Sequence, residues 1–289
     1  MGILSGLGNL GIDIKDGDIF AEDKQDSKIS PEELKKAEEE KKVAEEVEFL
    51  LKKSFTCPIC GADFKALSVK TNKARLLGQD VDLRPKYDKF DALKYTAVMC
   101  PNCGYAARAQ VFNEVSSKQK SIIREKIAAN YFSKSDDEQK EVYDYDTAIN
   151  HYQMAIGTAI VKGAKNSEKA YLCLQTAWVV RGKKESLDQT DPKYQEQLKE
   201  CEENEKELLQ NALEGFLKAR SSEDFPMCGM DQYTIDYIIA ALCYECNKFD
   251  VGLRLISELI SSRSVNSRIK DKARDLKELI AKKASAGAK

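Results

Sequence analysis

Four cysteines in two short motifs are the residues of this sequence whose types and spacing best suit chemistry. They stand in Cys57-Pro-Ile-Cys60-Gly61 and Cys100-Pro-Asn-Cys103-Gly104. Two residues between the cysteines let both sulfurs point at one ion, and the glycine that follows permits the positive φ that such a turn needs. Two of these knuckles supply four thiolates in a tetrahedron, which suits Zn²⁺ or, in the rubredoxin arrangement, iron.

We expect zinc at this site, because no redox partner domain or cofactor motif accompanies the cysteines. A redox dithiol pair is the competing interpretation, and the doubling of the motif disfavours it. A catalytic zinc ion keeps one coordination position for water, whereas four cysteines close the shell. The predicted ion is therefore structural, and its ligands are Cys57, Cys60, Cys100 and Cys103.

The interval of 39 residues between Cys60 and Cys100 is longer than the roughly 15–20 residues of common Cys₄ patterns. We interpret it as an inserted β-rich segment. Within it, residues 64–69 and 94–99 alternate in the manner of strands. They lead away from the first knuckle and into the second, so we expect them to pair with each other.

The same interval is a candidate nucleic-acid surface. From residue 63 to residue 94 it has eight Lys or Arg and five Asp, with aromatic residues close by. A basic surface with aromatics can bind phosphate and stack bases. The interspersed aspartates weaken this interpretation and favour an ordinary ribbon surface. The candidate contacts are Arg75, Arg84 and Lys86.

No catalytic constellation accompanies the cysteine motifs. The sequence lacks a Walker loop, a dinucleotide fingerprint, a nucleophile elbow and paired catalytic carboxylates. His151 is the only histidine, and without a recognisable partner it is predicted to be an ordinary helix residue. Cys243-Tyr-Glu-Cys246 lies in an apolar helix where thiols pack as small hydrophobes, although with Cys228 it leaves a second metal or redox site open. We expect a protein that is not an enzyme.

Composition places the chain among globular proteins. Its 289 residues allow two ordinary domains, and 42% are hydrophobic and 33% charged. Neither an apolar run of about 20 residues nor the basic flank of a secretory signal occurs, so we expect a cytoplasmic protein without a membrane span. Nine cysteines in such a chain favour metal binding or burial over a disulfide framework.

Five segments are expected along the chain. Ser30-Pro31-Glu32-Glu33 is a helix start with an N-cap, a proline and a capping glutamate. The thin apolar stripe after it predicts a solvated helix that runs to about Lys53. The segments are a flexible arm (1–29), a charged helix (30–54), a Cys₄ zinc-ribbon module with a β insertion (55–110), tetratricopeptide-like helical hairpins (111–262), and a basic C-terminal helix and tail (263–289).

The helical part contains a partial internal repeat. A small-aromatic-small spacing typical of the second helix of a tetratricopeptide unit occurs at Ala148, Tyr152 and Ala155, and again at Ala212, Phe216 and Ala219. A third helix pair, around 235–246 and 251–260, keeps the hairpin but not this pattern. Stacked hairpins leave a concave groove of the kind that binds peptides or protein termini. The fold class predicted is therefore mainly α, with a small β-rich Cys₄ ribbon followed by an irregular hairpin array.

The run from Phe55 to Ala107, with Arg84-Pro-Lys-Tyr87 and Cys100-Pro-Asn-Cys-Gly-Tyr-Ala106, resembles the bacterial family of domain of unknown function 2225. The resemblance covers roughly residues 50–260. It implies a metal ribbon followed by tetratricopeptide-like helices, and it implies no activity. We expect a zinc-binding scaffold or adaptor whose helical groove binds a protein or peptide. The alternative is a nucleic-acid-associated regulator that contacts phosphates through the basic interval.

Overall fold

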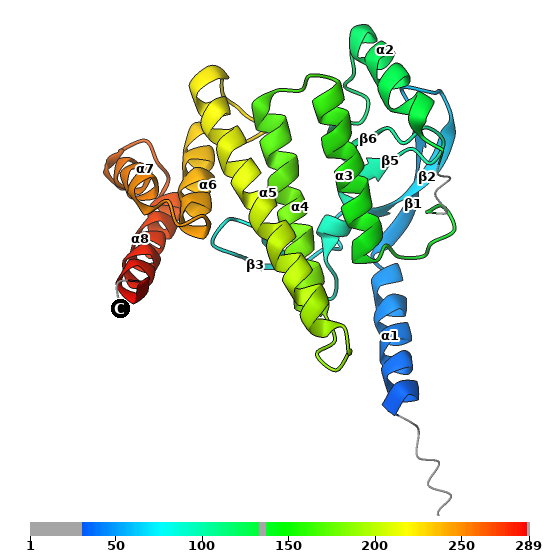
Figure 1. Ribbon diagram of the computed structural model, residues 1–289, viewed down its shortest axis with the longest axis horizontal. Coiled ribbons are helices and arrows are strands. Elements are labelled where there is room, and N and C mark those ends of the chain that lie inside the picture. Colours follow the sequence, from blue (N-terminus) through cyan, green and yellow to red (C-terminus); the bar gives the residue numbers. More distant parts are fainter. Residues whose placement is uncertain (1–30, 133–136, 288–289) are drawn as a thin grey trace, which may run out of the picture. The chain divides into compact units, whose positions relative to one another are not determined.

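The computed structural model describes residues 31–132 and 137–287. The predicted arm at residues 1–29 lies outside the described residues. The chain divides into two compact units, one up to Lys41 and one from Lys42 to Lys289. The described part is mainly helical, with α-helices α1 to α8 and three sheets of two strands each (Figure 1). This is the fold class that the sequence predicts.

Helix α1 (Pro31–Val47) begins at the proline that the sequence indicates. The prediction that it continues to about Lys53 is wrong, because strand β1 (Leu50–Thr56) occupies these residues. β1 pairs with β2 (Asp63–Val69) and sets Phe55 opposite Phe64. The two buried rings stack with their centroids 5.7 Å apart. As a strand, residues 50–56 bury Leu50 and Phe55, whereas Leu51 is exposed.

Each knuckle is the turn of its own antiparallel hairpin. The first joins β1 to β2, and the second joins β5 (Ala97–Met99) to β6 (Ala106–Arg108). The predicted pairing of residues 64–69 with 94–99 is therefore wrong. A two-residue knuckle reverses the chain so tightly that each strand meets its sequence neighbour first. Residues 92–95, before β5, form the 3₁₀ helix η3.

The interval between the knuckles is β-rich, as predicted, but its hairpin is separate from the two hairpins that carry the knuckles. Strands β3 (Leu76–Gln79) and β4 (Pro85–Tyr87) pair with each other at residues 76–87. The turn that joins them, residues 80–84, leaves the ribbon and reaches the helices.

The helices after the ribbon pack in chain order. α3 (Tyr145–Val161) covers β5 and β6, and each helix from α3 onward packs against the next one (Figure 1). No helix in the described part of the chain is long and apolar enough to cross a membrane. The other helices are α2 (Ser117–Lys126), η4 (Ala109–Val111), η5 (Ala128–Asn130), α4 (Asn166–Ser186), α5 (Tyr194–Ser222), α6 (Gln232–Glu245), α7 (Phe249–Ser261) and α8 (Ser267–Gly287).

The small-aromatic-small positions lie in the core between these helices. All six residues of the two patterns are buried: Ala148, Tyr152, Ala155, Ala212, Phe216 and Ala219. Small side chains let neighbouring helices approach closely, and each aromatic ring fills the space that remains. Trp178 of α4 is buried in the same core. Helical hairpins are thus present, and their likeness to tetratricopeptide units stays a prediction.

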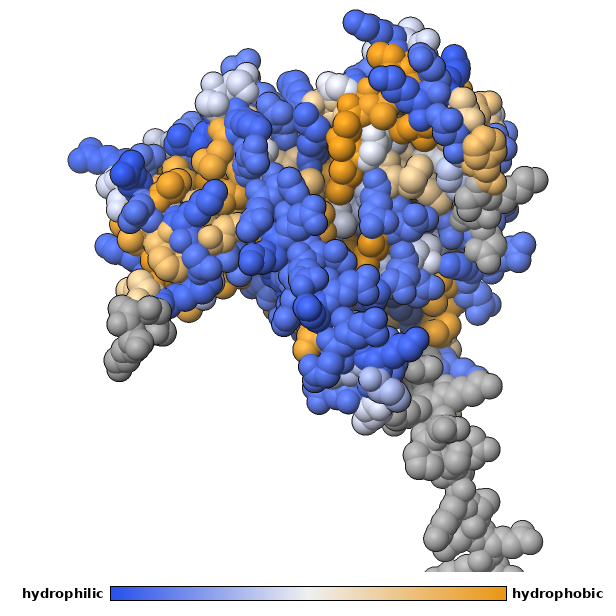
Figure 2. All heavy atoms as spheres, viewed as in Figure 1, coloured by the Kyte–Doolittle hydropathy of each residue, from blue (hydrophilic) through white to orange (hydrophobic). Residues whose placement is uncertain are grey.

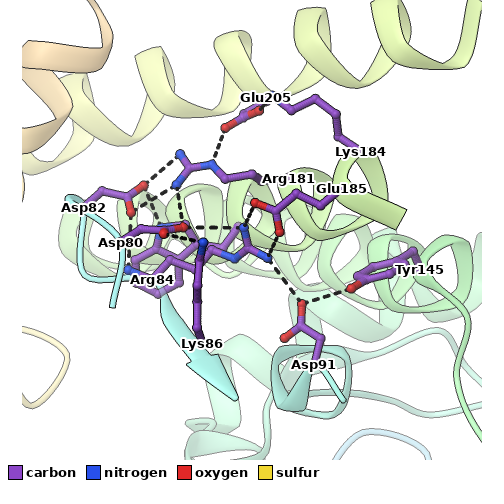
Figure 3. A network of polar contacts seen from close by, with 11 residues as sticks. Asp80, Asp82, Arg84, Lys86, Asp91, Tyr145, Arg181, Lys184, Glu185 and Glu205 are labelled. Atoms are coloured by element: carbon purple, nitrogen blue, oxygen red, sulfur yellow. Dashed lines mark hydrogen bonds and ion pairs between the residues drawn. The ribbon is translucent and has the colours of Figure 1, made fainter. Parts of the chain in front are cut away.

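A buried carboxylate fixes the β3–β4 turn on the helices (Figure 3). Asp82 is fully buried and accepts a hydrogen bond from Nε1 of Trp178 at 2.9 Å. Its carboxylate also lies 2.9 Å from the guanidinium of Arg181, which pairs in turn with Glu205 of α5. The hydroxyl of Tyr237 on α6 donates to the carbonyl of Val81 at 2.8 Å. The turn therefore contacts α4 and α6 directly, and it is linked to α5 through Arg181.

Replacement of Asp82 by alanine should destabilise the protein by about 3 kcal/mol, because it leaves the indole N–H unpaired and Arg181 undercompensated. Urea denaturation followed by circular dichroism measures this loss. Glu203→Ala removes an exposed carboxylate from a surface pair with Lys199 and should cost at most about 0.5 kcal/mol. Equal losses in the two variants would contradict the role given to Asp82.

Candidate metal centre

The sulfurs of Cys57, Cys60, Cys100 and Cys103 converge at one point. All four lie within 4.8 Å of one another, and no other cluster of three or more potential metal ligands occurs among the described residues. The Sγ atoms of Cys57 and Cys103 are 3.6 Å apart, as are those of Cys60 and Cys100. A tetrahedron with metal–sulfur bonds of about 2.3 Å has edges of about 3.8 Å. The four cysteines therefore match the geometry of a metal site.

The two knuckles have the same backbone geometry. Gly61 N–H donates to the carbonyl of Cys57 at 3.0 Å, and Gly104 N–H donates to the carbonyl of Cys100 at 2.9 Å. The two glycines have φ values of +78° and +71°. The positive φ that the sequence predicts is confirmed at both positions. In the first knuckle the N–H of Ile59 also points at the Cys57 sulfur, 3.4 Å away, and thereby favours its thiolate form.

A small apolar core holds the two knuckles together. Phe55, Ile59, Phe64 and Phe112 are buried in it together with three of the cysteine side chains, whereas Cys60 is exposed. Arg124 of α2 donates from Nε to the carbonyl of Ile59 at 2.8 Å. Rigid packing of this kind holds the ligands in place before an ion binds.

The proximity of the sulfurs gives the site the electrostatics that suit a cation. Hydrogen bonds from the neighbouring thiols lower the pKa of Cys57, and hydrogen bonds to Cys100 and Cys57 raise the pKa of Cys103. Ionisation of one thiol to a thiolate thus makes ionisation of its neighbours less favourable. A divalent cation removes this opposition, because it binds all four as thiolates.

The three predicted nucleic-acid contacts do not form a common surface patch of free cations. Arg84 is buried, and its guanidinium makes two hydrogen bonds of 2.9 Å to the carboxylate of Glu185 (Figure 3). Lys86 is half exposed and pairs with Asp80 at 2.9 Å. Arg75 is exposed. The prediction for Arg84 is thus corrected: its charge is used inside the protein, on a carboxylate 101 positions away in the sequence.

The histidine and the other cysteines noted in the sequence have packing roles or side-chain partners in the fold. His151 is buried, and its Nε2 lies 2.7 Å from Asp137, a carboxylate partner that the sequence did not reveal. Cys243 packs against Gly252 of α7, where an added Cβ would lie 3.1 Å from it. Cys228 and Cys246 do not join it in a metal cluster. The described part of the chain therefore holds no second metal cluster at these cysteines.

A groove runs across α4 between α3 and α5. Its volume is about 380 Å³, and its apolar floor includes Ile149, Val180 and Leu208. The surface over α5 is largely hydrophilic, while apolar atoms form a stripe over the upper part of α3 (Figure 2). The groove has three carboxylates and one cation: Asp146, Glu200, Glu207 and Lys183. Hairpin stacking predicts a groove but not its lining. The spacing of residues within one helix does not show which side chains of the neighbouring helices face it.

Alanine at Gly104 should destabilise the knuckle more than alanine at Gly61. Both positions have positive φ, which costs an alanine about 1 kcal/mol. At Gly104 the added methyl group would also collide with the ring of Tyr131, whereas the space beside Gly61 is open. We expect Gly104→Ala to lose about 1–3 kcal/mol more than Gly61→Ala in chemical denaturation of metal-loaded protein. Equal losses would show that Tyr131 does not cover this knuckle.

Comparisons with known proteins give a family match over most of the chain. A family model described as "Uncharacterized protein conserved in bacteria (DUF2225)" matches residues 50–280. An uncharacterised protein of Borreliella burgdorferi is 27% identical over 88 residues, which is 28% of this chain and 32% of the relative. The match thus spans about a third of the relative's length. No solved structure matches the chain. The chain belongs to the family of uncharacterised bacterial proteins known as domain of unknown function 2225.

Proposed function

We propose that this protein is a non-enzymatic scaffold with one structural zinc ion, and that its helical groove binds a peptide segment of a protein partner. The observation that carries the proposal is the groove between α3 and α5, whose apolar floor lies between charged side chains. An apolar floor supplies binding energy by burial, and the charges select the register of the peptide. The metal ion holds the ribbon on which α3 rests.

The charges of the groove indicate the chemistry of the partner. Lys183 pairs with Asp146 at 2.6 Å, which leaves Glu200 and Glu207, both exposed on α5, as an acidic edge. A peptide that combines apolar side chains with Lys or Arg complements this lining. Nucleic acid does not, because phosphates would meet carboxylates here. The basic interval offers few free cations for phosphate, since Arg84 and Lys86 are already paired with carboxylates.

Zinc is supported by the ligand set. Four thiolates favour zinc or iron over hard cations such as Mg²⁺. Protein purified without added metal should contain one zinc ion per chain by atomic emission. The double variant Cys57→Ser, Cys100→Ser should lose it, since each knuckle then keeps one sulfur only. Stoichiometric iron with red colour would contradict zinc and indicate electron transfer.

Reversal of the acidic edge, Glu200→Lys with Glu207→Lys, should abolish partner recovery in affinity purification from native cells after nuclease treatment. The variant places two cations where a basic peptide would lie. The matched control is Glu196→Lys with Glu203→Lys, which makes the same charge change at exposed positions of α5 outside the groove. It should keep the partner.

Two results would contradict the proposal. One is the recovery of the same partner at the same yield with both double variants, which would place the binding surface elsewhere. The other is a partner signal that nuclease removes and that Arg75→Ala weakens, which would favour the nucleic-acid alternative.

A further inference from the structure

Arg108 is a buried cation without an anionic partner. It ends strand β6, is 9% exposed, and its Nε makes no hydrogen bond. Its guanidinium stacks on the ring of Tyr171 at 5.0 Å, and no ion pair of Arg108 occurs among the described residues. Arginine holds its charge at any physiological pH, so burial costs free energy until an anion compensates it.

Arg108 lines a cavity of about 170 Å³ between the ribbon and the helices. The cavity lies at the start of α4, and Lys162, Ser167 and Cys228 also line it. Its size suits a group of a few heavy atoms. A planar guanidinium in the wall of such a cavity presents hydrogen-bond donors that fit two oxygen atoms of one ligand.

The other charged side chains of the interior each have a partner. Lys162 pairs with Glu168 at 2.7 Å. Glu223 accepts hydrogen bonds from the backbone N–H groups of Asn166 and Ser167, so one carboxylate occupies the N-terminus of α4. Burial raises the pKa of the Cys228 thiol above its ordinary value, so this thiol is neutral at pH 7 and supplies no counter-charge.

The remaining charged residues of the wall lie at its rim. Glu114, Lys165 and Asp224 are exposed, and water and salt screen exposed charges. Among the charged side chains of this wall that lie below the rim and that the structure describes, Arg108 alone has neither an ion pair nor a side-chain hydrogen bond.

We propose that this cavity is a binding site for a small oxyanion, a carboxylate or phosphate group, with Arg108 as its anchor. The ligand accepts hydrogen bonds from the guanidinium and replaces the ion pair that the protein itself does not make. This site is separate from the peptide groove and from the four cysteines. It does not depend on the proposed function.

The test uses the full chain with its metal, and the probes are sodium acetate and sodium phosphate, each compared with sodium chloride at equal ionic strength. A bound anion raises the midpoint of thermal unfolding. We expect such a rise with at least one probe, and the stronger probe distinguishes carboxylate from phosphate. Arg108→Met should abolish the rise and weaken binding by about tenfold or more in calorimetric titration.

Two further measurements separate binding from folding. Arg108→Met should be at least as stable as the wild type in chloride, because methionine keeps much of the packing on Tyr171 and removes an uncompensated buried charge. Lys165→Met removes a rim cation and should keep the anion response. The proposal fails if neither anion raises the midpoint, if Arg108→Met responds as the wild type does, or if both variants lose the response equally.

Discussion

The buried carboxylate of Asp82 connects the parts of this protein that the metal site alone would leave apart. An ion bound by the four cysteines would hold the two ends of the insertion, at Cys60 and Cys100, but it would not fix the position of its middle. Asp82 fixes the middle of the insertion to the helices, because its carboxylate accepts a hydrogen bond from an indole N–H and pairs with a guanidinium. A fully buried carboxylate is tolerated only in fixed geometry, since any displacement leaves its charge unpaired. The turn therefore has one position on the helices.

This docking decides which charges remain available for binding. The insertion looks basic in sequence, yet Arg84 pairs with Glu185 and Lys86 pairs with Asp80. The same contacts fix α4, across which the groove between α3 and α5 runs. They do not reach Arg108 at the end of β6, whose guanidinium stacks on the ring of Tyr171. Internal pairing thus leaves an acidic groove and one unpaired buried cation.

Features of short range could be predicted from the sequence. Each Cys-x-x-Cys-Gly motif predicts the positive φ of its own glycine, because a knuckle is a property of five consecutive residues. The doubling of the motif predicts that the four sulfurs share one site, because one ion needs both knuckles. The buried small-aromatic-small positions of α3 and α5 also follow from spacing along one helix. The strand pairing was mispredicted, since alternation identifies strands and does not name their partners.

The sequence by itself determined the four ligand candidates, the mainly helical class and the buried faces of two helices. Only the tertiary structure decided that Arg84 is an internal residue, that His151 meets Asp137, and that Arg108 meets no carboxylate. The physical reason is distance along the chain. An ion pair between residues 101 positions apart depends on the path of every element between them, whereas a knuckle depends on its own backbone alone.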